Sequence, residues 1–130
     1  ISISLGEGFI VRPGVDIRDK AEELELMCEL GVTRINTAIM DPDVNRCYEQ
    51  IGKLVEMANA VNVETTLEFG PGLTIFDLPS ALTAIRQVGD SNLRLLIDTM
   101  HFCRSGSDIQ QLAQLAPGSP PRPLLIRPQP

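Results

Sequence analysis

The chain has 130 residues, of which 43% are hydrophobic and 22% charged, and its formal net charge is −6. This length allows a single domain with a real core, and the acidic balance lacks the basic footprint of a nucleic-acid-binding surface, so we expect no nucleic acid partner. No apolar stretch reaches the roughly 20 residues that cross a bilayer, and no signal-peptide pattern is present, so we expect no membrane contact. The three cysteines, Cys28, Cys47 and Cys103, are odd in number and form no CxxC pair, so we expect reduced thiols and a cytoplasmic location.

Apolar, β-branched segments recur at a nearly fixed interval and predict four strands. They begin at Ile1, Val32, Val63 and Leu93, which lie roughly 30 residues apart, the length of one βαβ unit. An amphipathic helical pattern follows each of them, over residues 16–31, 43–61, 77–89 and 107–116. Strand and helix in alternation indicate a parallel sheet.

The third helical pattern has signals at both of its ends. Asp77 is a suitable N-cap for this helix and Gly89 a suitable stop for it.

Two other fold classes are weighed against this pattern. A doubly wound fold stays open, although the segment GEGFIVRPG does not match the GxGxxG pattern that such folds place after the first strand. A repeat solenoid is disfavoured, because the units share no consensus sequence.

One face of three predicted strands is polar. It carries Arg34 and Asn36 on the second strand, Glu64, Thr66 and Glu68 on the third, and Arg94 and Asp98 on the fourth. A strand between two helical layers is apolar on both faces, whereas a barrel can gather polar groups in its lumen. The fold class we predict is therefore α/β, a partial (β/α)₈ TIM barrel of about four βα units.

Glu68 and Asp98 end neighbouring strands, and we expect them at the same level, roughly 5 to 7 Å apart. Two such carboxylates repel each other unless one is protonated or a cation lies between them, and Mg²⁺ or Mn²⁺ suits oxygen ligands. The alternative is a network of ion pairs in which Arg34 and Arg94 neutralise the two carboxylates.

His101 and Arg104 follow Asp98 closely. His101, the only histidine, could be a further ligand, a hydrogen-bond donor to substrate or an exposed side chain without a role. Arg104 could hold an anionic or phosphorylated substrate at the start of a helix, or lie along the surface.

At these residues the sequence resembles the sugar phosphate isomerase/epimerase family of the xylose isomerase-like TIM barrel superfamily, which also contains AP endonuclease family 2. The segments TTLEFGPGLTIFDLPSALTAI and LRLLIDTMHFCRSGSDIQQLA carry the resemblance, above all LEF and, about thirty residues later, DTMHFxRSG. It covers residues 1–116, which we predict to be one partial barrel domain.

The resemblance implies a metal-dependent reaction. A divalent cation, Mn²⁺ before Mg²⁺, Co²⁺ or Zn²⁺, would be held by Glu68 and Asp98 together with ligands from later strands. Glu68 would also act in proton transfer between adjacent carbons of a small sugar, sugar phosphate or hydroxy acid. His101, Arg104 and Asn36 would contact the substrate, although in the endonuclease branch the equivalent histidine is a zinc ligand.

Residues 117–130 depart from this pattern, because six of the fourteen are proline and none is His, Asp or Glu. Proline at this density opposes a central strand, so we expect an irregular tail that is disordered or the scar of a truncation or frameshift. We then expect an inactive enzyme fragment that self-associates through open barrel edges.

Three alternatives remain. The chain could be a non-catalytic fragment or interaction module that uses its proline-rich tail. It could be a dehydroshikimate-type dehydratase, or an AP endonuclease-like DNA repair enzyme, which the single histidine and the net charge of −6 disfavour.

Overall fold

The computed structural model describes residues 2–115 and 124–127, which form an α/β fold around one parallel sheet. Its five strands lie in the order β1-β2-β3-β4-β5, and every neighbouring pair is parallel. The strands are β1 (Gly6–Val11), β2 (Arg34–Ile39), β3 (Glu64–Glu68), β4 (Leu93–Asp98) and β5 (Leu124–Arg127). The connecting helices are η1 (Ile17–Lys20), α1 (Ala21–Glu29), α2 (Val44–Ala60), α3 (Leu78–Val88), α4 (Thr99–Arg104) and α5 (Ile109–Ala113).

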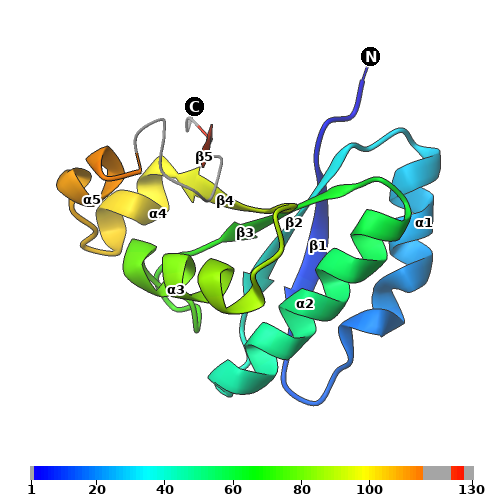
Figure 1. Cartoon of the computed structure of the whole chain (residues 1–130), viewed down its shortest axis with the longest axis horizontal. Helices are drawn as coiled ribbons and strands as arrows, with labels where there is room; N and C mark the ends of the chain where they lie inside the picture. Colours follow the sequence, from blue (N-terminus) through cyan, green and yellow to red (C-terminus); the bar gives the residue numbers. More distant parts are fainter. Residues whose placement is uncertain (1, 116–123, 128–130) are drawn as a thin grey trace.

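The strand order identifies the barrel class. A doubly wound sheet reverses its order at a switch point, whereas a (β/α)₈ barrel adds each new strand beside the previous one. Here the order follows the chain from blue to red without a reversal, and α1, α2 and α3 lie along one side of the sheet (Figure 1). The predicted partial TIM barrel is confirmed, and the doubly wound alternative is excluded.

The hydrophobic core lies between the sheet and these helices. Most strand positions that face the helices are apolar and buried, as at Ile35, Leu67 and Leu95, and they pack with buried residues of α2 and α3 such as Leu54 and Ala84. The alternate positions carry the charged side chains, so these occupy the opposite face, as a barrel lumen requires.

The helix signals predicted from the sequence are present. Asp77 caps α3 by accepting a hydrogen bond from the Ser80 backbone N–H, and Gly89 ends the helix with a φ of 72°. This left-handed conformation favours glycine because it has no Cβ to clash.

Two strands differ from the sequence prediction. The first strand begins at Gly6 and not at Ile1, because Phe9 and Val11 are its core residues while Ile3 is exposed. Residues 124–127, expected to be irregular, form β5 beside β4, so the β4 edge that we expected to be open is paired. This four-residue segment lies between Pro123 and Pro128 and contains no proline itself. All four of its residues therefore have the backbone N–H that strand pairing requires.

The remaining predictions for the tail, its disorder or its origin as a scar, fall on residues 117–130, of which 117–123 and 128–130 lie outside the described residues. Among the described helices, none is long and apolar enough to cross a membrane.

Candidate metal centre

The polar face of the sheet is organised by strand register. Arg34 pairs with Glu64 across β2 and β3, Asn36 pairs with Thr66, and Glu68 pairs with Leu96 across β3 and β4. Asp98 therefore lies two residues further along its strand than the partner of Glu68. The prediction that Glu68 and Asp98 share one level is wrong, because the strands of a barrel are staggered.

The lumen arginines share a carboxylate below the candidate metal ligands. Arg34 Nε lies 2.7 Å from Glu64 Oε2, and Arg94 Nε contacts the other oxygen of the same carboxylate. Both guanidinium groups thus meet β3 four residues before Glu68. The predicted alternative, in which these arginines neutralise Glu68 and Asp98, is therefore wrong: in the described part of the chain both arginines pair with Glu64.

Glu68 is oriented by a chain of hydrogen bonds across two strands. Asn36 Nδ2 donates to Glu68 Oε2 over 2.6 Å, and Thr66 Oγ1 donates to Asn36 Oδ1 over 2.9 Å. Asn36 is 7% exposed and Thr66 fully buried. The structure therefore places Asn36 against Glu68, and its predicted substrate contact stays a prediction. Thr66 was not predicted, although its position on the same strand face could have indicated it.

Asp98 joins the end of β4 to the short helix α4, which the helical pattern of the sequence does not predict. Its Oδ1 accepts hydrogen bonds from the backbone N–H of Met100 and of His101, at 2.8 and 3.3 Å. This N-cap starts α4 immediately after the strand and brings the His101 side chain back over the sheet. Asp98 itself is 3% exposed.

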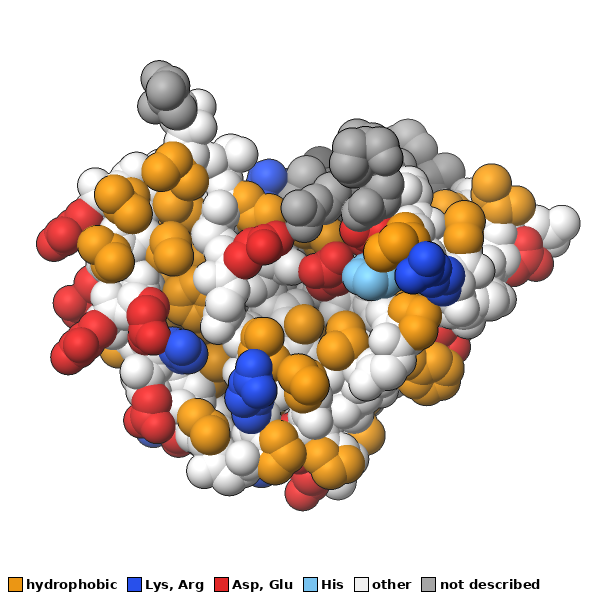
Figure 2. Space-filling view, turned by 180° about the vertical axis from the view of Figure 1, so that it is seen from behind, with side chains coloured by type: hydrophobic (Ala, Val, Ile, Leu, Met, Phe, Trp, Pro, Cys, Tyr) orange, Lys and Arg blue, Asp and Glu red, His pale blue; other side chains and the backbone are white. Residues whose placement is uncertain are grey.

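His101 faces Glu68 across the gap between α4 and β3. Its Nε2 lies 3.9 Å from Glu68 Oε1, and its Nδ1 is buried without a hydrogen-bond partner among the described residues. Figure 2 shows this face of the molecule, with the histidine in pale blue beside acidic side chains in red.

Glu68, Asp98 and His101 each offer one ligand atom, and these atoms lie within 4.8 Å of one another. Two carboxylates and an imidazole are a donor set that zinc, manganese and other divalent cations accept. The residues therefore fit a divalent cation. The structure brings Glu68 and Asp98 together, as expected from the sequence, and places His101, one of whose predicted roles was a further ligand, in the same cluster.

Arg104 lies at the end of α4 and not at the start of a helix, as the sequence suggested. It is three residues from His101, so both side chains leave the same side of α4. Arg104 is exposed and makes no hydrogen bond or ion pair with the described part of the chain. Its predicted contact with substrate stays a prediction.

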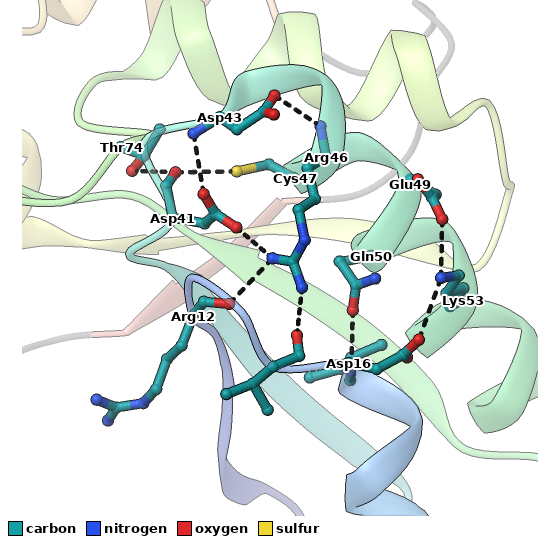
Figure 3. A network of polar contacts seen from close by, with 12 residues as sticks. Arg12, Asp16, Asp41, Asp43, Arg46, Cys47, Glu49, Gln50, Lys53 and Thr74 are labelled. Atoms are coloured by element: carbon teal, nitrogen blue, oxygen red, sulfur yellow. Dashed lines mark hydrogen bonds and ion pairs between the residues drawn. The ribbon is translucent and has the colours of Figure 1, made fainter.

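A second polar network fastens the loops after β1 and β2 to α2 (Figure 3). Arg46 donates to Asp41 Oδ2, to the Arg12 carbonyl at 3.0 Å and to the Val15 carbonyl at 2.6 Å. The backbone N–H of Asp43 holds the pKa of Asp41 below its usual value, and Arg46 lowers that pKa further.

Cys47 belongs to this network as a structural group. Burial, together with the negative charge of Asp41, raises the pKa of the Cys47 thiol to about 11. Its Sγ donates to the Asp41 carbonyl oxygen at 3.1 Å. A thiol with this pKa stays protonated at neutral pH and is a poor nucleophile.

No family model matches the chain, and no curated protein matches it significantly. Solved structures do. A xylose isomerase-like TIM barrel/4-hydroxyphenylpyruvate dioxygenase fusion protein aligns over 98% of this chain and 22% of its own, with a TM-score of 0.81 and 18% identity. The IolI protein, crystallised with a zinc atom, aligns over 87% and 47%, with a TM-score of 0.76 and 20% identity.

Two further structures have the same architecture. The probable 3-DHS dehydratase AsbF of Bacillus anthracis aligns over 89% of this chain and 47% of its own, with a TM-score of 0.73 and 22% identity. An AP endonuclease of family 2 from Brucella melitensis aligns over 91% and 56%, with a TM-score of 0.60 and 15% identity. The chain spans about half the length of the IolI and AsbF structures that it matches. It has the fold of part of a xylose isomerase-like TIM barrel.

Proposed function

We propose that the chain carries the metal-binding part of an active site for a divalent-metal-dependent sugar or sugar phosphate isomerase or epimerase. The observation that carries this proposal is the convergence of Glu68, Asp98 and His101, whose ligand atoms lie within 4.8 Å of one another at the carboxyl ends of β3 and β4. In TIM barrels, that end of the strands bears the chemistry.

The metal would polarise a carbonyl or hydroxyl oxygen of the substrate. Glu68 and Asp98 would supply oxygen ligands, and His101 would supply Nε2, the nitrogen directed at Glu68. Manganese is our first choice, because carboxylate ligands suit it. Zinc is the second, because the IolI structure contains a zinc atom.

Glu68 is also the group we assign to proton transfer between adjacent carbons. Asn36 donates to one of its oxygens, which fixes the carboxylate plane and leaves the other oxygen, Oε1, on the side of His101. A general base needs this kind of fixed orientation toward the proton it removes. Arg104 would bind the anionic end of the substrate, a phosphate or carboxylate, by charge-assisted hydrogen bonds.

A dehydratase acting on a cyclic hydroxy acid is a second candidate, favoured by the similarity to AsbF. It needs the same first step, removal of a proton beside a carbonyl, followed by loss of water. The endonuclease alternative is supported by the fold likeness only, and the net charge of −6 opposes binding to DNA.

The experiment is a titration of the metal-free chain with Zn²⁺, Mn²⁺ and Co²⁺ by calorimetry, comparing wild type with Glu68→Gln. The glutamine side chain keeps the size of glutamate and can still accept from Asn36, but it lacks the ligand charge. We expect one ion per wild-type chain and a loss of affinity of about 100-fold or more in the variant, about 2.7 kcal/mol or more. Glu56→Gln, an exposed carboxylate on α2, is the matched control and should bind like wild type.

The reaction class is then tested by NMR, through metal-dependent incorporation of solvent deuterium beside the carbonyl of ketoses, ketose phosphates and cyclic hydroxy acids. Exchange without loss of water supports the isomerase, and exchange followed by dehydration supports the dehydratase. Equal metal affinity in wild type and Glu68→Gln would contradict the metal centre, and would leave the tail-based interaction module as the alternative to pursue.

A further inference from the structure

We propose that Gly70 is a positioning residue for His101: the missing side chain at this position lets the imidazole lie against the backbone with Nε2 directed at Glu68. The inference rests on the proposed function only for its consequence on metal binding. A Cβ added to Gly70 would lie 3.1 Å from His101 Cγ and 3.3 Å from both Cδ2 and Nδ1. These distances are shorter than ordinary van der Waals contact between carbon atoms.

The backbone conformation does not explain the glycine. Gly70 is absent from the residues with a left-handed φ, whereas Gly72, two residues later in the same loop, has a φ of +83°. Alanine at position 70 is therefore permitted by the backbone, and the space taken by the His101 ring is what opposes it.

The Gly70 backbone is also held in place. It is buried two residues after the end of β3, its N–H donates to the Ile75 carbonyl at 3.3 Å, and Pro71 follows it. An added methyl group would accordingly displace the imidazole and not the loop.

The ring of His101 depends on this contact because, within the part of the chain that the structure describes, no hydrogen bond holds it. A metal-binding histidine ordinarily donates its second ring N–H to a carboxylate, carbonyl or water, which fixes the ring orientation. The buried Nδ1 of His101 has no such partner among the described residues. The flat surface of Gly70 fixes the ring by packing instead.

A displaced His101 ring would change the geometry of the candidate metal site formed by Glu68, Asp98 and His101. His101 Nε2 is now 3.9 Å from Glu68 Oε1, at a separation that one cation can bridge. A ring pushed away from β3 separates these atoms, while Glu68 and Asp98 stay where their own hydrogen bonds hold them.

The test uses the full chain with Gly70→Ala, and Gly52→Ala as the matched control. Gly52 lies in α2, and a Cβ there meets nothing within 4 Å. Since His101 is the only histidine, the imidazole resonances in an NMR spectrum belong to it alone. In the metal-free protein we expect these resonances to shift in Gly70→Ala and to stay unchanged in Gly52→Ala. With Co²⁺ as the probe, we expect an affinity loss of about 10- to 100-fold in Gly70→Ala.

A double-mutant cycle on the melting temperature separates the ring from a general loss of folding. Gly70→Ala should lower Tm in the wild-type background and leave it unchanged in a His101→Ala background, where the ring is absent. If Gly70→Ala alone does not fold, the double variant should fold.

An equal loss of Tm in both backgrounds, or unchanged imidazole resonances and Co²⁺ affinity in Gly70→Ala, would overturn the inference. If wild type binds no metal, the proposed function fails, while the resonances and the Tm cycle still decide the role of Gly70.

Discussion

Asn36 and Thr66 lie outside the candidate metal centre, yet they orient one of its three side chains, Glu68. Neither offers a charge, yet together they form a line of hydrogen bonds from the buried Thr66 hydroxyl through the Asn36 amide to Glu68 Oε2. Because a carboxylate only accepts hydrogen bonds, the Asn36 Nδ2 must face Glu68, which sets the orientation of the amide. Hydrogen-bond partners of this kind raise the affinity of a site for its metal ion, because they hold the metal-binding side chain in one geometry.

The first prediction concerns this line. Asn36→Ala removes the donor to Glu68, so we expect the affinity for Co²⁺ to fall by about 10- to 100-fold. The free energy of unfolding should fall by about 1 to 3 kcal/mol, because the partners of the lost amide are buried or partly buried. Calorimetric titration and urea unfolding measure the two effects.

Thr66→Val should give a smaller loss of affinity, because Asn36 keeps its contact with Glu68 but loses its own support. Asn45→Ala, an exposed position on α2, is the control and should change neither quantity. Wild-type affinity in Asn36→Ala would show that Glu68 needs no orienting donor.

At the scale of elements, the N-terminal half of α2 connects loops that are far apart in the sequence. Arg46 reaches the carbonyl groups of Arg12 and Val15 in the loop after β1, and Gln50 Oε1 accepts from the Ile17 backbone N–H at 2.6 Å. Asp41, at the end of β2, anchors Arg46 from the other side. The network therefore fixes two of the loops at the carboxyl end of the sheet.

The second prediction is a pH dependence of stability from Asp41. Its pKa in the folded chain is below the usual value of 3.8, so the unfolded chain binds this proton more readily. The stability that Asp41 contributes is complete above the unfolded pKa and is lost as the pH falls below it. We expect Asp41→Asn to be less stable than wild type at pH 6, with a difference that shrinks as the pH falls through 3.8 toward 2.5.

Urea unfolding at pH 6, 4.5, 3.5 and 2.5, roughly spanning the titration of a carboxyl group, measures this difference. Asp19→Asn, at an exposed side chain in η1 without a described hydrogen bond, is the control. A difference between wild type and Asp41→Asn that stays constant with pH would show that Asp41 acts by packing alone.

For the whole molecule, the sequence predicted the features that depend on local pattern. The strand-helix repeat gave the parallel sheet, the Asp77 cap and Gly89 bounded α3, and the alternation on β2, β3 and β4 placed Glu68 and Asp98 in the lumen. Each of these follows from neighbours within one element, where side-chain periodicity and backbone propensity act together.

What the sequence could not predict depends on contacts between distant residues. The stagger that sets Asp98 beyond Glu68 is a property of the sheet, and the contact of His101 with Gly70 joins residues about thirty positions apart. The helix α4 has six residues, too few for a periodic signal, and its Asp98 cap is also the last residue of a strand. The strand β5 was hidden by its flanking prolines.

The last prediction asks whether β5 is part of the sheet. In a parallel strand, the N–H and C=O of one residue point to the same side, and those of the next residue point to the other. Of Leu125 and Ile126, one therefore donates to β4, and the other faces the side of β5 away from β4. Proline in place of the residue that donates to β4 removes a hydrogen bond between the two strands. Proline in place of the other residue removes no hydrogen bond with β4.

The pair Leu125→Pro and Ile126→Pro thus forms a matched experiment. We expect hydrogen exchange of the β4 backbone amides that face β5 to speed up by about tenfold in one variant, the equivalent of one hydrogen bond, and to stay at the wild-type rate in the other. If both variants exchange like wild type, β4 is the edge of the sheet in solution and its backbone groups are open to another chain. Asymmetry between the two variants would instead establish that residues 124–127 close this edge beside Asp98, and so belong to the same folded unit as the metal centre.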